Sequence, residues 1–214
     1  MRTRSNLLRL AAVPILALGL LGTVASPATA APASTAQRAM ALARAVASSK
    51  DPSASLAGLS TADQALVKEA VTPVRTDVTT APANAGVLPD FLGTWNEHIT
   101  WTAKDVFNIS LYSYWQTTNA TAAGSGTTIS SVTVTDKGEQ IFNAGIGWRV
   151  AHAAVGSTKN CGWEGRGLAK FYFVLGTGGW DLEHPSNCGQ IRLNIDGHDK
   201  WILSSCDLQY NNAC

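Results

Sequence analysis

The sequence predicts an all-β fold, an antiparallel β-sandwich or jelly roll of about seven or eight strands, preceded by a short helical segment. All seven Trp, all four Tyr and all four Cys lie between Leu88 and Cys214. In the same stretch, short apolar and polar alternations are separated by glycine-rich turns, and no helical period exceeds two turns. A closed barrel has a similar pattern, so the sequence leaves sandwich and barrel open.

The first 30 residues have the organisation of a secretory signal peptide. Three arginines among the first nine residues precede an apolar run from Leu10 to about Val24, and Ala28-Thr29-Ala30 supplies a cleavage site. Pro14 interrupts the run, which is shorter than the roughly 20 residues that a membrane-spanning helix needs. We therefore expect residues 1–30 to be removed and the protein to be secreted, extracellular and without a membrane span.

Residues 31–87 are expected to form a helical pro-segment or a tether. They contain no Trp, Tyr, Phe or Cys, so they have little with which to build a core of their own. Two helices are predicted, in 34–50 and 59–71. The first has apolar residues at helical spacing, namely Ala36, Ala39, Met40, Ala43 and Val46.

The second predicted helix has its own boundary signals. Thr61 and Gln64 have the spacing of a capping box, and Pro73 ends the helix. The Pro, Thr and Ala content of 72–86 is typical of a linker. Composition does not separate a removable pro-segment from a flexible spacer.

The net charge of the segment 88–214 limits the classes of partner that it is expected to bind. It carries 8 basic and 11 acidic residues, so it offers no basic field to attract nucleic acid or anionic lipid. We therefore expect neither nucleic acid nor a membrane surface as a partner.

The predicted strands of 88–214 alternate apolar and polar residues. In "VFNISLYSYW", the odd positions are mostly apolar and are expected to face the core, whereas Tyr112 and Tyr114 lie on the side of Asn108 and Ser110. The strands are expected at 94–101, 106–115, 128–135, 145–155, 168–176, 190–195 and 200–205.

An Asp-Gly dipeptide separates the last two expected strands. A three-residue loop, Asp196 to His198, is favoured because it places Leu193 opposite Trp201 and keeps the apolar faces together. The same loop explains Asp196, His198 and Asp199 as turn residues, and no further ligand stands at a diagnostic metal spacing. We expect neither a metal nor a cofactor.

Four cysteines in an exported chain predict two disulfides, with three possible connectivities. They are Cys161, Cys188, Cys206 and Cys214. Spacing favours pairing Cys161 with Cys188 and Cys206 with Cys214. Asn before and Gly after each of the first two cysteines are then expected to form tight turns.

Residues that could support catalysis are few. The stretch "GGWDLEHPSN" gathers Trp180, Asp181, Glu183 and His184 within five positions. Neighbouring carboxylates rarely form the acid and base pair of glycoside cleavage, so a solvated loop is the favoured interpretation.

Two histidine positions complete the catalytic candidates. His152 is expected to be a hydrogen-bonded core histidine, and Glu97-His98 lacks a partner at a meaningful spacing. The motifs of serine hydrolases, zinc proteases and phosphate loops are absent from the sequence.

The sequence therefore favours a secreted binding module over an enzyme. Its ligand is expected to be an extracellular glycan or a protein partner such as a secreted protease. Tyr112 and Tyr114 are the predicted aromatic platform, and Trp180, Asp181 and Glu183 form a second candidate site. The alternatives are a small secreted hydrolase using some of Asp181, Glu183, His184 and His152, and a structural cell-surface component.

Overall fold

A computed structural model describes residues 34–81, 93–124, 126–177, 180–183, 185–197 and 199–205. For 177, 180–183 and 199–205 the backbone alone is described. All of these residues belong to the compact unit Ala33–Cys214. The expected signal peptide lies outside the described residues.

Three short helices form the amino-terminal part of this unit: α1 (Thr35–Ala47), α2 (Pro52–Ala57) and α3 (Thr61–Val71). Ser34 caps α1 through a reciprocal capping box with Gln37. The predicted apolar side of α1 is confirmed, because Ala39, Met40, Ala43 and Val46 are buried. The cap of α3 is Ser60 rather than the predicted Thr61, and its hydroxyl accepts the Asp63 N–H.

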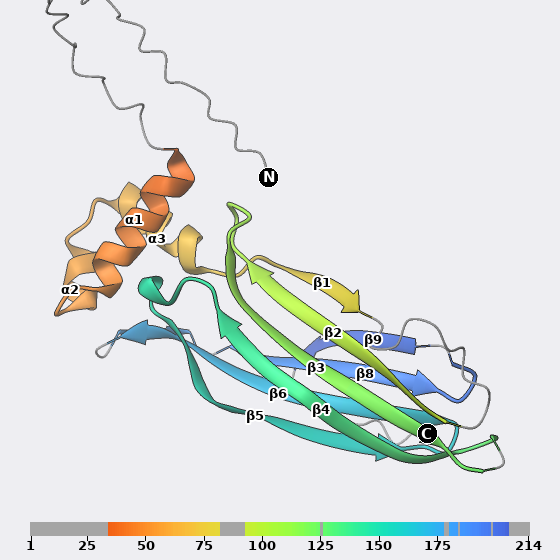
Figure 1. The fold of residues 1–214 in the computed structure, drawn as a ribbon. Helices are drawn as coiled ribbons and strands as arrows, with labels where there is room; N and C mark the ends of the chain where they lie inside the picture. The colour runs from red at the N-terminus through yellow and green to blue at the C-terminus, as the bar shows by residue number, and fades with distance from the viewer. Residues whose placement is uncertain are drawn as a thin grey trace, which may run out of the picture. The chain divides into compact units, whose positions relative to one another are not determined.

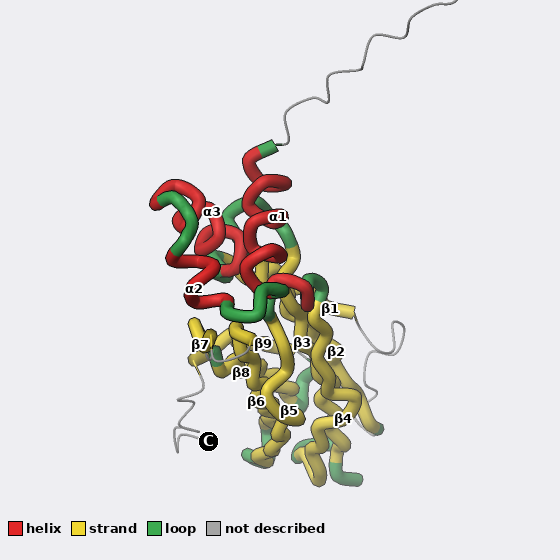
Figure 2. Tube along the Cα trace, turned by 90° about the vertical axis from the view of Figure 1, so that its left-hand side faces the viewer, coloured by secondary structure: helices red, strands yellow, loops and turns green. Residues whose placement is uncertain are grey.

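The strands form two antiparallel sheets, which confirms the predicted sandwich-like β fold. Sheet A has the order β1-β2-β3-β4 and sheet B the order β5-β6-β8-β9 (Figure 1). The short strand β7 pairs with β6. Figure 2 shows the two sheets as separate layers. The strands are β1 (Arg75–Ala81), β2 (Thr94–Lys104), β3 (Ser110–Ala122), β4 (Ile129–Ile141), β5 (Trp148–Asn160), β6 (Glu164–Thr177), β7 (Trp180–Glu183), β8 (Ser186–Asn194) and β9 (Asp199–Ser205).

Aromatic rings fill the space between the sheets. Tyr114 of β3 stacks on Trp101 of β2 with ring centroids 5.4 Å apart and meets Phe171 of β6 at 4.9 Å. Tyr112 stacks on Phe173 of β6 at 4.1 Å. The two layers are therefore joined by rings from both sheets.

Glycines let the sheets approach each other closely. A Cβ at Gly189 of β8 would lie 2.4 Å from the Trp101 ring, and one at Gly167 of β6 would lie 2.0 Å from the Thr118 hydroxyl. The buried Gln116 side chain also crosses the interface, because its Nε2 donates to the Gly167 carbonyl at 3.1 Å. The two sheets are thus joined by at least one hydrogen bond in addition to the contacts between aromatic rings.

The helices share the core of the sandwich. Buried residues of α1 and α3 belong to the same apolar cluster as the inner faces of the sheets. The indole N–H of Trp148, at the start of β5, donates to the Val71 carbonyl at the end of α3 (3.1 Å). A short 3-10 helix, η1 (Ala144–Ile146), links β4 to β5 and packs against α1.

Two segments expected to lack regular structure are strands. Residues 75–81, predicted as part of a linker, form β1, which pairs with β2 over its whole length. Its Thr-rich composition resembles a linker, but an edge strand needs only one partner and a half-buried face. Residues 180–183, predicted as a loop, form β7.

The β8–β9 hairpin differs from the prediction by two positions. Leu193 lies opposite Asp199 and Ile191 opposite Trp201, so the predicted pairing of Leu193 with Trp201 is wrong, and with it the predicted loop position at 196–198. A shift of two preserves which side of the sheet each residue occupies, whereas a shift of one would invert it. The apolar alternation therefore predicted which residues of β8 and β9 share a side of the sheet, but it did not predict which residues pair.

Within the described residues, no helix is long and apolar enough to cross a membrane.

Candidate functional site

The predicted aromatic platform is not at the surface. Tyr112 and Tyr114 are 1% and 2% exposed and lie in the core between the sheets. The predicted orientation of this strand is wrong because the regular alternation begins only at Ser110. Residues 105–109 form a turn in which Asn108 has a φ of 66° and Asp105 Oδ1 accepts the N–H groups of two following residues.

The second candidate site is only partly described. Asp181 lies opposite Gly176 and Glu183 opposite Leu175, because β7 pairs with β6. Their side chains and that of Trp180 are not described, and His184 lies outside the described residues. These positions stay a prediction.

The candidate histidines do not join that site. His152 was expected in the core, but it is exposed on the outer side of sheet B, with its ring 3.7 Å from that of Tyr172. It lies on β5 and Glu183 on β7, on opposite sides of β6, so their backbones are more than about 9 Å apart. Glu97 and His98 point to opposite faces of β2, with Glu97 in the interior.

The preferred cysteine pairing is also wrong. Cys161 donates its N–H to the Glu164 carbonyl, whereas Cys188 lies opposite Lys170. The six residue-to-residue steps from Glu164 to Lys170 span about 20 Å of strand. A disulfide requires Cα atoms within about 7 Å, so Cys161 and Cys188 cannot be joined to each other.

The two Asn-Cys-Gly sequences have different structures. In the first, Asn160 Oδ1 accepts the Gly162 N–H and Gly162 has a φ of 81°, which confirms the predicted turn. The second, which begins at Asn187, lies inside β8 and is not a turn. Cys206 and Cys214 lie outside the described residues.

The outer face of sheet A is the best candidate for a functional site. Along β2 and β3, residues that point away from sheet B are mostly Thr, Asn and Ser, and they lie opposite one another in register. Asn119 is typical, since its Nδ2 donates to the Thr135 hydroxyl at 2.9 Å. A face of this kind offers many hydroxyl and amide groups that both donate and accept hydrogen bonds.

Trp115 is the aromatic residue on this face. It lies opposite Thr100 of β2 and Gly138 of β4. A Cβ at residue 138 would lie 2.5 Å from the Trp115 ring, so the ring rests directly on the glycine backbone. Trp115 remains partly exposed in this position. The alternation of 106–115 predicted Trp115 to face the core, and this prediction is wrong.

A hydrogen-bonded cluster lies beside Trp115. His98 Nδ1 is 2.9 Å from the Thr117 hydroxyl and 3.6 Å from a carboxylate oxygen of Asp136, and His98 Nε2 is 3.4 Å from the Thr100 hydroxyl. We call Trp115, His98, Thr100, Thr117 and Asp136 the Trp115 face. It combines one aromatic surface with hydroxyl, imidazole and carboxylate groups.

A β-bulge places Asp136 on this face. Trp115 pairs with Gly138 and Thr117 with Thr135, so two residues of β4 oppose the single residue 116 of β3. Asp136 adopts a φ of 45° and its side chain is 70% exposed. The bulge therefore directs a carboxylate toward solvent next to His98.

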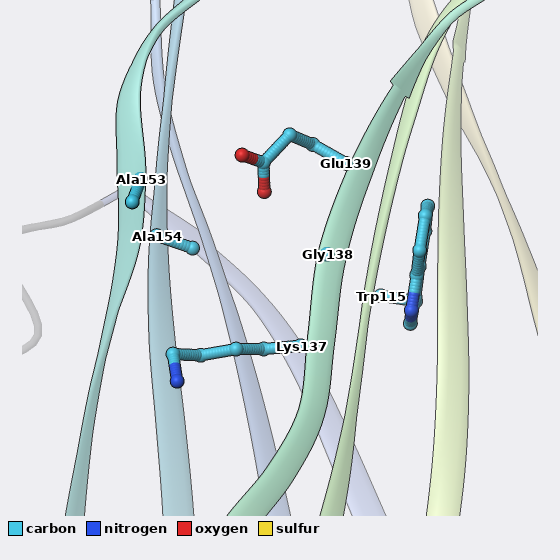
Figure 3. A pocket seen from close by; sticks show the side chains of 6 residues that line it. All are labelled: Trp115, Lys137, Gly138, Glu139, Ala153 and Ala154. Atoms are coloured by element: carbon cyan, nitrogen blue, oxygen red, sulfur yellow. The ribbon is translucent and has the colours of Figure 1, made fainter.

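An open hollow of about 400 Å³ lies at the same part of β4. It is lined by Trp115, Lys137, Gly138, Glu139, Ala153 and Ala154. Figure 3 shows the Trp115 ring on one side of β4, with Lys137 and Glu139 extending on the other side toward β5. Burial raises the pKa of Glu139 above its ordinary value of 4.5, and Lys137 opposes the shift.

Replacing Glu139 with glutamine is expected to change how stability depends on pH. A carboxyl whose pKa is raised by folding stabilises the folded state when protonated, and this contribution is lost as pH rises through the raised pKa. E139Q imitates the protonated form, so its stability advantage over the wild type should be small near pH 4 and grow toward about pH 7. Urea unfolding at several pH values measures this difference, and an advantage independent of pH contradicts the prediction.

Within the described residues, no group of three or more His, Cys, Asp or Glu side chains is arranged to hold a metal ion. Comparisons with protein-family models, with curated protein sequences and with solved structures found no match.

Proposed function

We propose that this protein is a secreted binding module that recognises an extracellular glycan through the Trp115 face. The observation that carries the proposal is the Trp115 ring resting on Gly138 beside the cluster of His98, Thr117 and Thr100. The apolar side of a sugar ring fits against an aromatic surface, and its hydroxyls need neighbours that donate and accept hydrogen bonds.

The composition of the face favours a glycan over a protein. Protein interfaces of standard size bury about 800 Å² on each partner and are enriched in aromatic residues, Met and Arg at their centres. The Trp115 face has one indole ring beside the polar groups of His98, Thr100, Thr117 and Asp136, and the rest of the outer face of β2 and β3 is mostly Thr, Asn and Ser. This composition suits a small ligand rich in hydroxyl groups.

Rigidity also supports the proposal. The aromatic anchor and its neighbours stand on three adjacent strands, and hydrogen bonds hold the His98 ring against Thr117 and Thr100. A site on strands loses little conformational freedom when ligand binds, so more of the contact energy contributes to affinity. Secretion is proposed from the signal-peptide pattern of residues 1–30.

Capture on two kinds of matrix tests the proposal. The purified protein is applied in parallel to insoluble polysaccharides, including cellulose, chitin and xylan, and to immobilised secreted proteases. We expect retention on at least one polysaccharide, with release by the matching soluble oligosaccharide. Retention on a protease with none on any polysaccharide contradicts the glycan proposal and favours a protein partner.

A further inference from the structure

Part of the outer face of sheet B, along β6 and β8, is buried although it points away from the other sheet. On β8, Gly189, Ile191 and Leu193 face the core, so Cys188 and Gln190 point outward. Cys188 is 1% exposed and Gln190 2%. The described elements that pack extensively on β6 and β8 are strands of the same sheet or of sheet A.

Charged and polar groups are buried on this outer face. Glu164 and Arg166 of β6, each 5% exposed, form an ion pair there. Gln190 Oε1, Arg192 Nε and Asn194 Oδ1 are buried without a hydrogen-bond partner in the structure. Buried polar atoms are normally paired, so this row of side chains indicates a polar segment packed against the face.

The cysteines identify that segment. Neither Cys161 nor Cys188 has a free thiol. The β6–β8 register places them about 20 Å apart, too far to bond to each other. The remaining cysteines of the chain are Cys206 and Cys214, so each of the first two must pair with one of these.

The β8–β9 register decides between the two crossed pairings. Ser204 lies opposite Cys188 and Ser205 opposite Asn187, so residue 206 comes only two positions after the partner of Cys188 and has the same strand parity as that partner. The end of sheet B that holds Cys161 is about 20 Å or more from Ser205. One residue of chain spans less than about 4 Å, so Cys206 cannot reach Cys161. The eight residue-to-residue steps from 206 to 214 can span at most about 26 to 29 Å, which reaches Cys161.

We propose that residues 206–214 fold back along the outer face of sheet B, held by disulfides Cys188–Cys206 and Cys161–Cys214. The Asp207 carboxylate complements Arg166 and Arg192, and the amides of this segment match the unpaired atoms of β8. Each bond forms as two thiols lose two protons and two electrons to the disulfide of a thiol–disulfide oxidoreductase, which becomes a dithiol.

Peptide mapping of the unreduced, alkylated protein tests the connectivity. Trypsin combined with a protease that cleaves before aspartate separates the four cysteines into fragments 160–166, 181–192, 201–206 and 207–214. We expect 181–192 linked to 201–206 and 160–166 linked to 207–214. A link between 160–166 and 181–192, or between 201–206 and 207–214, overturns the proposal, as do alkylated cysteines.

Arginine modification by phenylglyoxal tests whether the segment covers the face. Arg166 should be protected in the native chain and lose its protection when residues 206–214 are deleted and Cys161 and Cys188 become serine. Arg38, whose side chain is 62% exposed, is the control that reacts in both proteins. Protection of Arg166 that survives the deletion, or that disappears when the native protein is diluted, indicates another occupant and contradicts the proposal.

Discussion

Replacing Tyr114 with alanine is expected to lower the free energy of unfolding by about 3 to 5 kcal/mol, the usual cost of truncating a buried aromatic residue. The ring is 2% exposed, stacks on Trp101 and meets Phe171 of the opposite sheet. The substitution therefore leaves a cavity at the contact between the two layers. Urea unfolding followed by circular dichroism measures the loss.

Trp163 is the matched control for this experiment. It is 50% exposed in the connection between β5 and β6, so W163A should change stability by about 0.5 kcal/mol or less. If Y114A proves as stable as W163A, the Tyr114 ring does not lie between the sheets. The packing described for the two layers is then incorrect.

Replacing Trp115 with alanine is expected to weaken glycan binding by about 30-fold, since an aromatic anchor often contributes about 2 kcal/mol. The ring lies on the outer side of sheet A, and its removal exposes the Gly138 backbone without opening the core. Affinity electrophoresis in gels that contain the captured polysaccharide measures the change. Thermal unfolding of the same sample shows whether the variant is folded.

W163A again supplies the comparison, because it removes an exposed tryptophan from a different part of the surface. It should bind the polysaccharide as the wild type does. Equal losses in W115A and W163A indicate nonspecific adsorption of aromatic side chains. Unchanged binding by folded W115A excludes the Trp115 face as the site.

The fold class was predictable because it depends on patterns repeated along the whole segment 88–214, so an error in one strand does not change the prediction. Strand alternation and the distribution of Trp and Tyr indicated two β layers, and the apolar side of α1 was predicted from helical spacing. The strand β1 was missed because its pairing with β2 involves residues distant in sequence. The composition of a segment does not show whether the segment pairs with the edge of a sheet.

The site was not predictable, because one turn altered the alternation. The positive φ of Asn108 and the Asp105 side-chain hydrogen bonds end the pattern just before β3, so Tyr114 faces the core and Trp115 faces outward. The sequence contains a weak signal for this arrangement, in that Gly138 lacks the side chain that an aromatic ring would otherwise displace. This signal can be recognised only when the register of β3 with β4 is known, because the register places Gly138 opposite Trp115.

Cysteine spacing misled for a similar reason. Loop length in the sequence favoured Cys161 with Cys188, but β6 runs between them as an extended strand and holds them apart. A short sequence separation gives a short distance only when the chain turns. The distance between the two cysteines depends on the strand register, which the spacing of cysteines in the sequence does not reveal.

The most direct test of the glycan proposal is a titration of the protein with a soluble oligosaccharide of the captured polysaccharide, followed through the indole N–H signals in nuclear magnetic resonance spectra. The chain has seven tryptophans, and the spectrum of a W115F variant identifies the Trp115 signal. We expect this signal to shift most and to saturate with ligand, while those of the buried Trp101 and Trp148 and the distant Trp163 move little. Saturable binding that leaves the Trp115 signal unmoved contradicts the glycan proposal.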